Sequence, residues 1–202
     1  MYNSNITVRQ LYTMLLEDVD IAVSINTELF CLWLDSLQQM LYSEIIRHQR
    51  YTSIEGDGDA ILYSSLAHAD DESVPEARDI VAVFADNAEA QRVSGGIGRI
   101  LHSEHPAWYD GGSGICLMLP YKVDQTRIAH VVRPASVTSD KMDAECVRVP
   151  AEFVPMVLAR MRGEMYKVAN EDMLSAKWLA DYNTELETFK IWSANHNKMY
   201  GA

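Results

Sequence analysis

Two histidines and a carboxylate stand close together in the middle of the chain, and these groups are common metal ligands. The segment is His102-Ser103-Glu104-His105, followed by Pro106. In a metalloprotease helix, two histidines four residues apart share one face. Here they are three apart, and Pro106 predicts a turn instead of a helix. We interpret the segment as surface residues before a hairpin and expect no metal ligands.

Two glycine-containing segments partly resemble ligand-binding loops. The carboxylates of Glu55–Asp59 are spaced as in a calcium loop, but Leu62 and His68 stand where an EF-hand counted from Asp57 has Gly and Glu. Ser94–Arg99 could bind an anion through backbone N–H groups. It lacks the Lys-Ser/Thr of a P-loop and the third glycine of a dinucleotide fingerprint. We expect both segments to be turns, with no cofactor bound.

The three cysteines, Cys31, Cys116 and Cys146, are odd in number and widely spaced. Without a C-x-x-C pair they predict neither a disulfide framework nor a thiolate zinc site. No G-x-S-x-G motif or recognisable carboxylate pair is present. We therefore expect no catalytic residues and no enzyme activity. The alternative is a small soluble α+β enzyme that uses His102, His105 or Cys116.

The C-terminal segment combines aromatic residues, methionine and lysines in an otherwise acidic chain. Such side chains are frequent anchors at protein interfaces. One interpretation is a frayed helix end. The other is a docking segment, whose candidate partner-binding residues are Trp192, His196, Lys198, Met199 and Tyr200.

Helical patterns at both ends of the 202-residue chain position these candidates. Apolar periodicity predicts helices over residues 8–18 and from 24 or 26 to about 48. After Pro150, it predicts helices over 155–168 and 171–193. Thr7 and Gln10 have capping-box spacing before the first helix. The last helix is expected to bury a stripe made by Met173, Ala176, Leu179, Tyr182, Leu186 and Phe189.

The middle of the chain holds most of its glycines and prolines between short apolar runs, a pattern typical of strands. Runs at 60–66, 80–84, 98–102, 114–119, 127–133 and 146–149 predict strands. Tyr109-Asp110-Gly111-Gly112 predicts a hairpin turn. We therefore expect an α+β fold in which residues 1–50 and 150–202 form a discontinuous helical bundle. Residues 51–149 form a β-rich insertion, a hairpin or small sandwich.

Charge limits the partners. With 17 Lys+Arg against 29 Asp+Glu, the formal charge is −12, which disfavours binding to a nucleic-acid backbone over a broad face. No apolar run approaches about 18 residues, so we expect no membrane span. The first ten residues have no basic-then-apolar signal pattern, and we expect synthesis in a reducing cytoplasm. An acidic host-interaction protein that mimics DNA is a second alternative.

Apolar, aromatic, proline and glycine residues recur along the chain in a definite order of segments. They are Leu29, Trp33, Leu37 and Leu41; Pro106–Gly111; Ile115–Pro120; Arg127–Pro134; Val147–Phe153; Ala169–Asp172; and Ala176, Trp178, Tyr182 and Phe189. This order resembles that of the head-to-tail adaptor (connector) proteins of tailed bacteriophages. In that family a proline- and aromatic-marked hairpin and further strands precede a closing helix pair.

The resemblance implies a structural virion protein without cofactors. Such a protein forms a homo-oligomeric ring, commonly of twelve copies, beneath the portal protein at the head–tail junction. The ring extends the DNA channel and provides a platform for tail or nozzle proteins, while DNA passes through the lumen without sequence-specific binding. The C-terminal segment of the family typically engages the portal. We therefore expect a virion location after synthesis in the host cytoplasm, and carboxylates that face the lumen would repel passing DNA.

Overall fold

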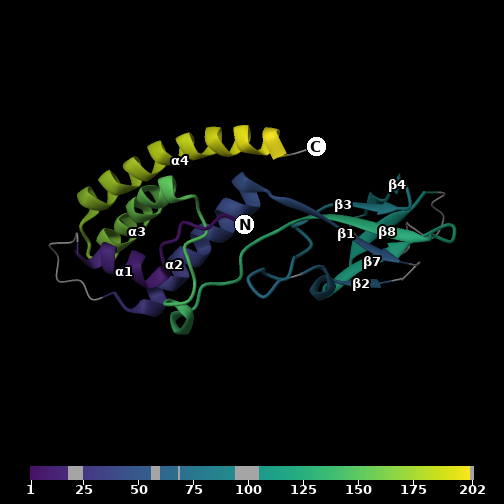
Figure 1. Cartoon of the computed structure of the whole chain (residues 1–202), viewed down its shortest axis with the longest axis horizontal. Helices are drawn as coiled ribbons and strands as arrows, with labels where there is room; N and C mark the ends of the chain where they lie inside the picture. The colour runs from purple at the N-terminus through teal and green to yellow at the C-terminus, as the bar shows by residue number, and fades with distance from the viewer. Residues whose placement is uncertain (18–24, 56–59, 68, 94–104, 201–202) are drawn as a thin grey trace. The chain divides into compact units, whose positions relative to one another are not determined.

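The computed structural model describes residues 1–17, 25–55, 60–67, 69–93 and 105–200, the last four by backbone alone. The fold is α+β and divides into two units (Figure 1). Met1–Ile46 and Ser136–Ala202 form the helical unit, and Arg47–Ala135 form the β unit. The β unit is therefore inserted into the helical one.

Among its described residues, the helical unit has four α-helices: α1 (Val8–Glu17), α2 (Thr27–Met40), α3 (Val154–Val168) and α4 (Asp172–Tyr200). The Thr7 hydroxyl accepts a hydrogen bond from the Gln10 N–H (3.1 Å), while the Gln10 side chain accepts one from the Thr7 N–H (2.8 Å). This is the predicted capping box. Asn26 caps α2 by accepting from the Leu29 N–H at 2.7 Å. A π-helical turn, Leu41–Ile46, extends α2.

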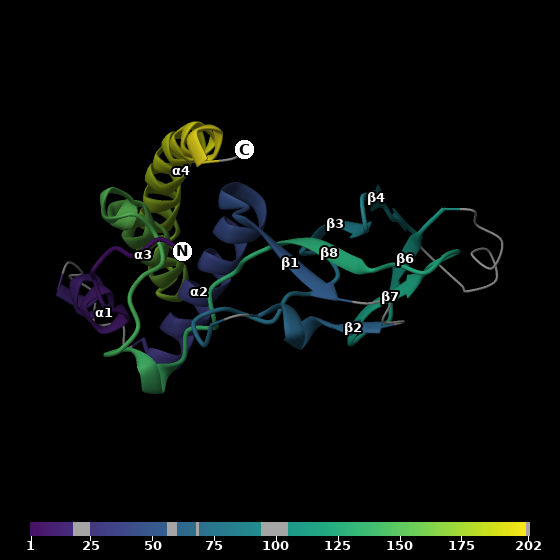
Figure 2. The same cartoon turned by 45° about the vertical axis from the view of Figure 1, so that its right-hand side comes forward.

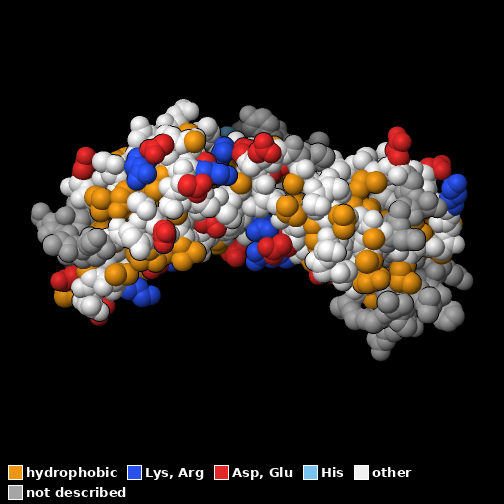
Figure 3. Space-filling view, turned by 90° about the horizontal axis from the view of Figure 1, so that it is seen from below, with side chains coloured by type: hydrophobic (Ala, Val, Ile, Leu, Met, Phe, Trp, Pro, Cys, Tyr) orange, Lys and Arg blue, Asp and Glu red, His pale blue; other side chains and the backbone are white. Residues whose placement is uncertain are grey.

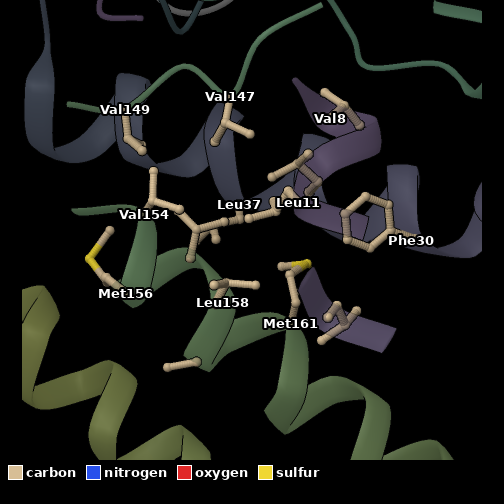
Figure 4. Close-up of a cluster of buried hydrophobic side chains, with 14 of the residues drawn as sticks. Val8, Leu11, Phe30, Leu37, Val147, Val149, Val154, Met156, Leu158 and Met161 are labelled. Atoms are coloured by element: carbon tan, nitrogen blue, oxygen red, sulfur yellow. The ribbon is translucent and has the colours of Figure 1, made fainter. Parts of the chain in front are cut away.

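The core of the helical unit is formed by apolar side chains from α1, α2, α3 and the loop that contains Val147 and Val149 (Figure 4). Val8 and Leu11 of α1 meet Leu37 of α2 and Met161 of α3. Figures 1 and 2 both show α4 lying along α3 on the outer side of this unit. Four buried side chains attach α4 to it: Ser175, Tyr182, Phe189 and Ser193.

The expected buried stripe of α4 is partly wrong. Tyr182 and Phe189 are buried as expected, but Met173 is 88% exposed and Ala176 is also exposed. The contact with α3 begins instead at Ser175, whose hydroxyl donates to the Gly163 carbonyl at 2.9 Å. The apolar pattern predicted Met173 and Ala176 at this contact, but the small polar residue Ser175 makes it instead.

Within the described residues, the β unit contains two four-stranded sheets that share one hydrophobic cluster, so it is a small sandwich. The first has the order β1 (Gln49–Glu55), β8 (Gln125–Val131), β3 (Ile80–Ala85) and β4 (Ala88–Glu89). The second has the order β2 (Ala60–Leu62), β7 (Gly114–Met118), β6 (Ala107–Asp110) and β5 (Gln91–Arg92).

The predicted hairpin joins β6 and β7, which pair antiparallel from Ala107↔Met118 to Asp110↔Ile115. Gly112 has φ +86°, a conformation that favours glycine. The Asp110 side chain accepts a hydrogen bond from the Gly112 N–H at 2.8 Å. A glycine is also needed at Gly114, because an added Cβ would lie 2.3 Å from the Ile61 carbonyl oxygen.

The unit boundaries differ from those expected at 50/51 and 149/150. Residues 47–50 belong to the β unit because β1 begins at Gln49, where the sequence pattern predicted the end of a helix. Residues 136–149 belong to the helical unit. The predicted strand at 146–149 is wrong: the Val147 N–H donates to the Ile6 carbonyl (2.9 Å) and Val149 is fully buried in the helical core. The strand predicted at 98–102 lies outside the described residues.

Candidate interaction surface on the helical unit

An aromatic group holds the C-terminal half of α4 against the rest of the helical unit. The Phe153 and Phe189 ring centroids are 4.7 Å apart. Trp192 contacts Tyr2 at 5.3 Å, Phe153 at 5.4 Å and Phe189 at 5.8 Å, and stacks on His196 at 3.9 Å. Three segments far apart in the sequence therefore meet at one tryptophan.

Polar contacts fasten the same region. The Tyr2 N–H donates to the Tyr42 hydroxyl at 2.9 Å, and the Ser193 hydroxyl donates to the Ile45 carbonyl at 3.4 Å. Ser193 is fully buried. These contacts thus join α4 to the N-terminal segment and to the end of the π-helical turn.

These contacts change the interpretation of the predicted docking segment. Trp192 is half-buried and stacks with His196, so both rings contribute to the chain's own fold. The backbone is helical through Tyr200, and the predicted helix end at 193 is therefore wrong. The side chains of Lys198, Met199 and Tyr200 lie outside the described part of the structure. Their role in partner binding stays a prediction.

Sequence patterns did not indicate a second feature, a half-open cleft of about 210 Å³ where α2, α3 and α4 meet. Its lining residues are Trp33, Ser36, Leu37, Met40, Arg160, Glu164 and Tyr182. Arg160 forms an ion pair with Glu164 at 2.6 Å, and its guanidinium lies 5.5 Å from the centroid of the Tyr182 ring. Burial raises the pKa of Tyr182 above its ordinary value. The cleft thus combines apolar walls with one charged pair.

The three cysteines, all described, are free thiols that differ in burial. Cys31 is buried on α2, and burial raises the pKa of its thiol. Cys116 on β7 pairs across the hairpin with Tyr109, whose pKa is raised by the hydrogen bond with Cys116. The raised pKa makes the Cys31 thiol a poor nucleophile, because the thiolate is the reactive form. The backbone of Cys146 pairs with that of Thr7 in an isolated antiparallel β-bridge.

The remaining sequence candidates fall mostly outside the described residues. Glu55 ends β1, whereas 56–59 are not described, and 94–99 are likewise outside. Of the His102–His105 segment only His105 is described, and it is exposed just before β6. In the part of the chain that the structure covers, no three His, Cys, Asp or Glu side chains gather as a metal site would require.

The β unit has buried charges that act within its own fold. Arg133 forms ion pairs with Asp79 (2.8 Å) and Glu76 (3.4 Å). The side chain of Arg133 is 6% exposed and that of Asp79 is 1% exposed. Arg50 forms a bidentate pair with Glu72, both distances 2.6 Å. The hydrogen bonds that Arg50 donates to the Glu72 carboxylate raise the pKa of Arg50. These pairs connect β1 and the residues that follow β8 to the 72–79 segment.

Charges of both signs lie on the face of the molecule drawn in Figure 3. On the face that Figure 3 shows, acidic and basic side chains are interspersed, and hydrophobic side chains form separate groups. Among the described helices, none has both the length and the apolar character needed to cross a membrane.

Comparison with known protein families and with curated proteins gives no match to the chain. The function is therefore argued from the fold and the surfaces described above.

Proposed function

We propose that this protein is a head-to-tail adaptor of a tailed bacteriophage, a structural virion protein that forms a ring beneath the portal. The observation that carries the proposal is the arrangement of its two units. A β sandwich is inserted into a helical unit that contains both chain ends, and that unit finishes with a 29-residue helix. This is the arrangement that the family resemblance implies.

The long final helix supports a docking role. The helix α4 continues to Tyr200, beyond His196, whose ring stacks on Trp192 of the same helix. The ring contacts of Trp192 lie before residue 197, so the proposal assigns fold stabilisation to Trp192 and docking to the segment 197–202. In the proposed complex this segment engages the portal, and the aromatic group fixes the direction in which α4 leaves the helical unit.

The net charge of −12 supports passage of DNA through the ring. Each copy repeats the same excess of carboxylates around the lumen. Like charges repel the DNA backbone and disfavour adhesion, over a range set by the Debye length of about 8 Å at physiological salt. Strong binding of free duplex DNA at that salt concentration would contradict this part of the proposal.

Co-elution with the portal tests the function. The purified full chain is mixed with the portal protein of the same phage and separated by size-exclusion chromatography. We expect it to elute with the portal in a fixed ratio. A chain that always elutes separately from the portal would sink the proposal.

A further inference from the structure

The outer side of α4 displays two large apolar side chains. Met173 is 88% exposed and Ile191 is 66% exposed, the highest values for large apolar residues among the described side chains. They are 18 residues apart, which is about five helical turns. Both therefore lie on one line along the helix, about 27 Å apart.

That line is opposite the side on which α4 packs against its own unit. At about 100° per residue, the buried residues Ser175, Tyr182, Phe189 and Ser193 lie within about 20° of the opposite line. Figures 1 and 2 show the outer side of α4 uncovered by the other helices of this unit. Packing within the helical unit thus accounts for the four buried residues of α4, but not for the exposed apolar residues Met173 and Ile191.

Four exposed residues fill the outer line between its apolar ends. Ala180 and Thr184 lie at its centre, with Lys177 before them and Glu187 after them, all within about 40° of the line. The Thr184 hydroxyl donates to the Ala180 carbonyl at 3.1 Å, so it is satisfied within the helix. Covering this residue therefore leaves no hydroxyl unpaired.

The order of these residues is self-complementary. We propose that a second copy of this chain binds the outer line of α4 through its own α4, antiparallel, about a two-fold axis at the level of residue 182. Met173 then lies opposite the partner's Ile191. Lys177 lies opposite the partner's Glu187, and Ala180 opposite the partner's Thr184.

Charge and size favour this occupant. In the antiparallel arrangement both charged positions meet an opposite charge, whereas a parallel pair in register would place lysine against lysine and glutamate against glutamate. Glu187 already binds Lys190 of its own helix at 2.7 Å, so a second lysine would join an existing pair. Small residues at the centre allow helix axes to approach to about 8 Å.

The contact goes beyond the adaptor function and does not depend on it. A two-fold contact closes at two copies, whereas a ring needs head-to-tail contacts. We therefore assign the α4 pair to the free protein before assembly. One helix pair covers less area than a standard interface of about 800 Å² per partner, so we expect a weak dimer with a dissociation constant of about 1 μM or above.

Charge reversal tests the pair. Sedimentation equilibrium of the full chain without portal should show a monomer–dimer equilibrium. Lys177→Glu and Glu187→Lys each create like-charge contacts and should weaken the dimer at least about tenfold, which is about 1.4 kcal/mol. The double variant restores opposite charges and should dimerise to within about threefold of the wild type. Circular dichroism checks that each variant is folded.

A matched control is Glu185→Lys, which reverses an exposed charge about 120° around the helix from the line and should leave dimerisation unchanged. A monomer at all concentrations up to about 200 μM overturns the inference, as does a double variant that stays as weak as the singles. Because the readout is self-association without portal, either result leaves the adaptor proposal standing.

Discussion

At the scale of single residues, the β unit depends on a buried ion pair. Arg133 and Asp79 are almost fully buried, and the Asp79 carboxylate also accepts the Glu76 N–H at 2.8 Å. The sequence did not indicate this pair, because 54 residues separate its members and neither is part of a motif. Only the pairing of β3 with β8 brings them together.

Arg133→Met should destabilise the protein by about 3–5 kcal/mol, because it leaves a carboxylate buried without its charge partner. Urea denaturation measures the loss. The matched control is Arg9→Met, which removes an exposed pair with Asp143 (41% and 77% exposed) and should cost at most about 1 kcal/mol. Equal losses for the two variants would show that Arg133 is not held as a buried charge partner.

Glu145 predicts a pH dependence. Burial raises the pKa of this carboxyl above its ordinary value of 4.5, although Lys141 and Arg148 oppose the shift and Asp140 and Asp35 add to it. The folded state then binds the proton more tightly than the unfolded state. Stability from this group is present below pH 4.5 and is lost as the pH rises through the folded pKa.

Comparison with Glu145→Gln isolates this effect. The stability of the wild type minus that of the variant should fall between pH 4 and 7, measured by urea denaturation at each pH. A difference that stays constant or rises with pH would mean that burial does not control this carboxyl.

At the scale of elements, Gly163 sets the distance between α3 and α4. A Cβ at this position would lie 2.6 Å from Leu179 Cδ2 and 2.8 Å from its Cγ. Alanine would favour the helix by about 1 kcal/mol, but overpacking costs about 1–3 kcal/mol. Gly163→Ala should therefore lower the free energy of unfolding by up to about 2 kcal/mol.

Leu179→Val supplies the matched test of that explanation, because it shortens the side chain that the new methyl would meet. The double variant should recover part of the loss seen with Gly163→Ala alone. If Gly163→Ala is more stable than the wild type, the helices are not in close contact at this point.

The elements also show what could be predicted from sequence. Local signals were sufficient for the Thr7 capping box and the Asp110–Gly112 turn, because each acts over a few residues. For the start of the second helix they left residues 24 and 26 as alternatives, and the structure has Asn26 as the cap. The strand β1 was missed because Gln49–Glu55 alternates only weakly and gains its partners from β8, about 75 residues later. The cleft beside Tyr182 was missed for a similar reason, since three helices must pack before it exists.

At the scale of the whole molecule, α4 has one part that stabilises the fold and another, after His196, that is proposed to bind the portal. A chain ending after His196 keeps the Trp192 stack and the Ser193 hydrogen bond. It should keep its melting temperature to within about 2 °C while losing co-elution with the portal. Trp192→Ala is the counterpart and should lower stability, since it removes contacts with three other rings besides His196.

Unchanged portal binding by the shortened chain would assign docking to another surface. Loss of folding in that chain would mean instead that residues after His196 contribute to the core.

The central claim is that copies of this chain form a ring on a portal. Electron microscopy of the portal, alone and after mixing with the full chain, tests it most directly. We expect an added ring of density on the tail side of the portal, coaxial with its channel and made of repeated copies of the helical unit and the β unit. Portal particles that are identical with and without the protein would contradict the account.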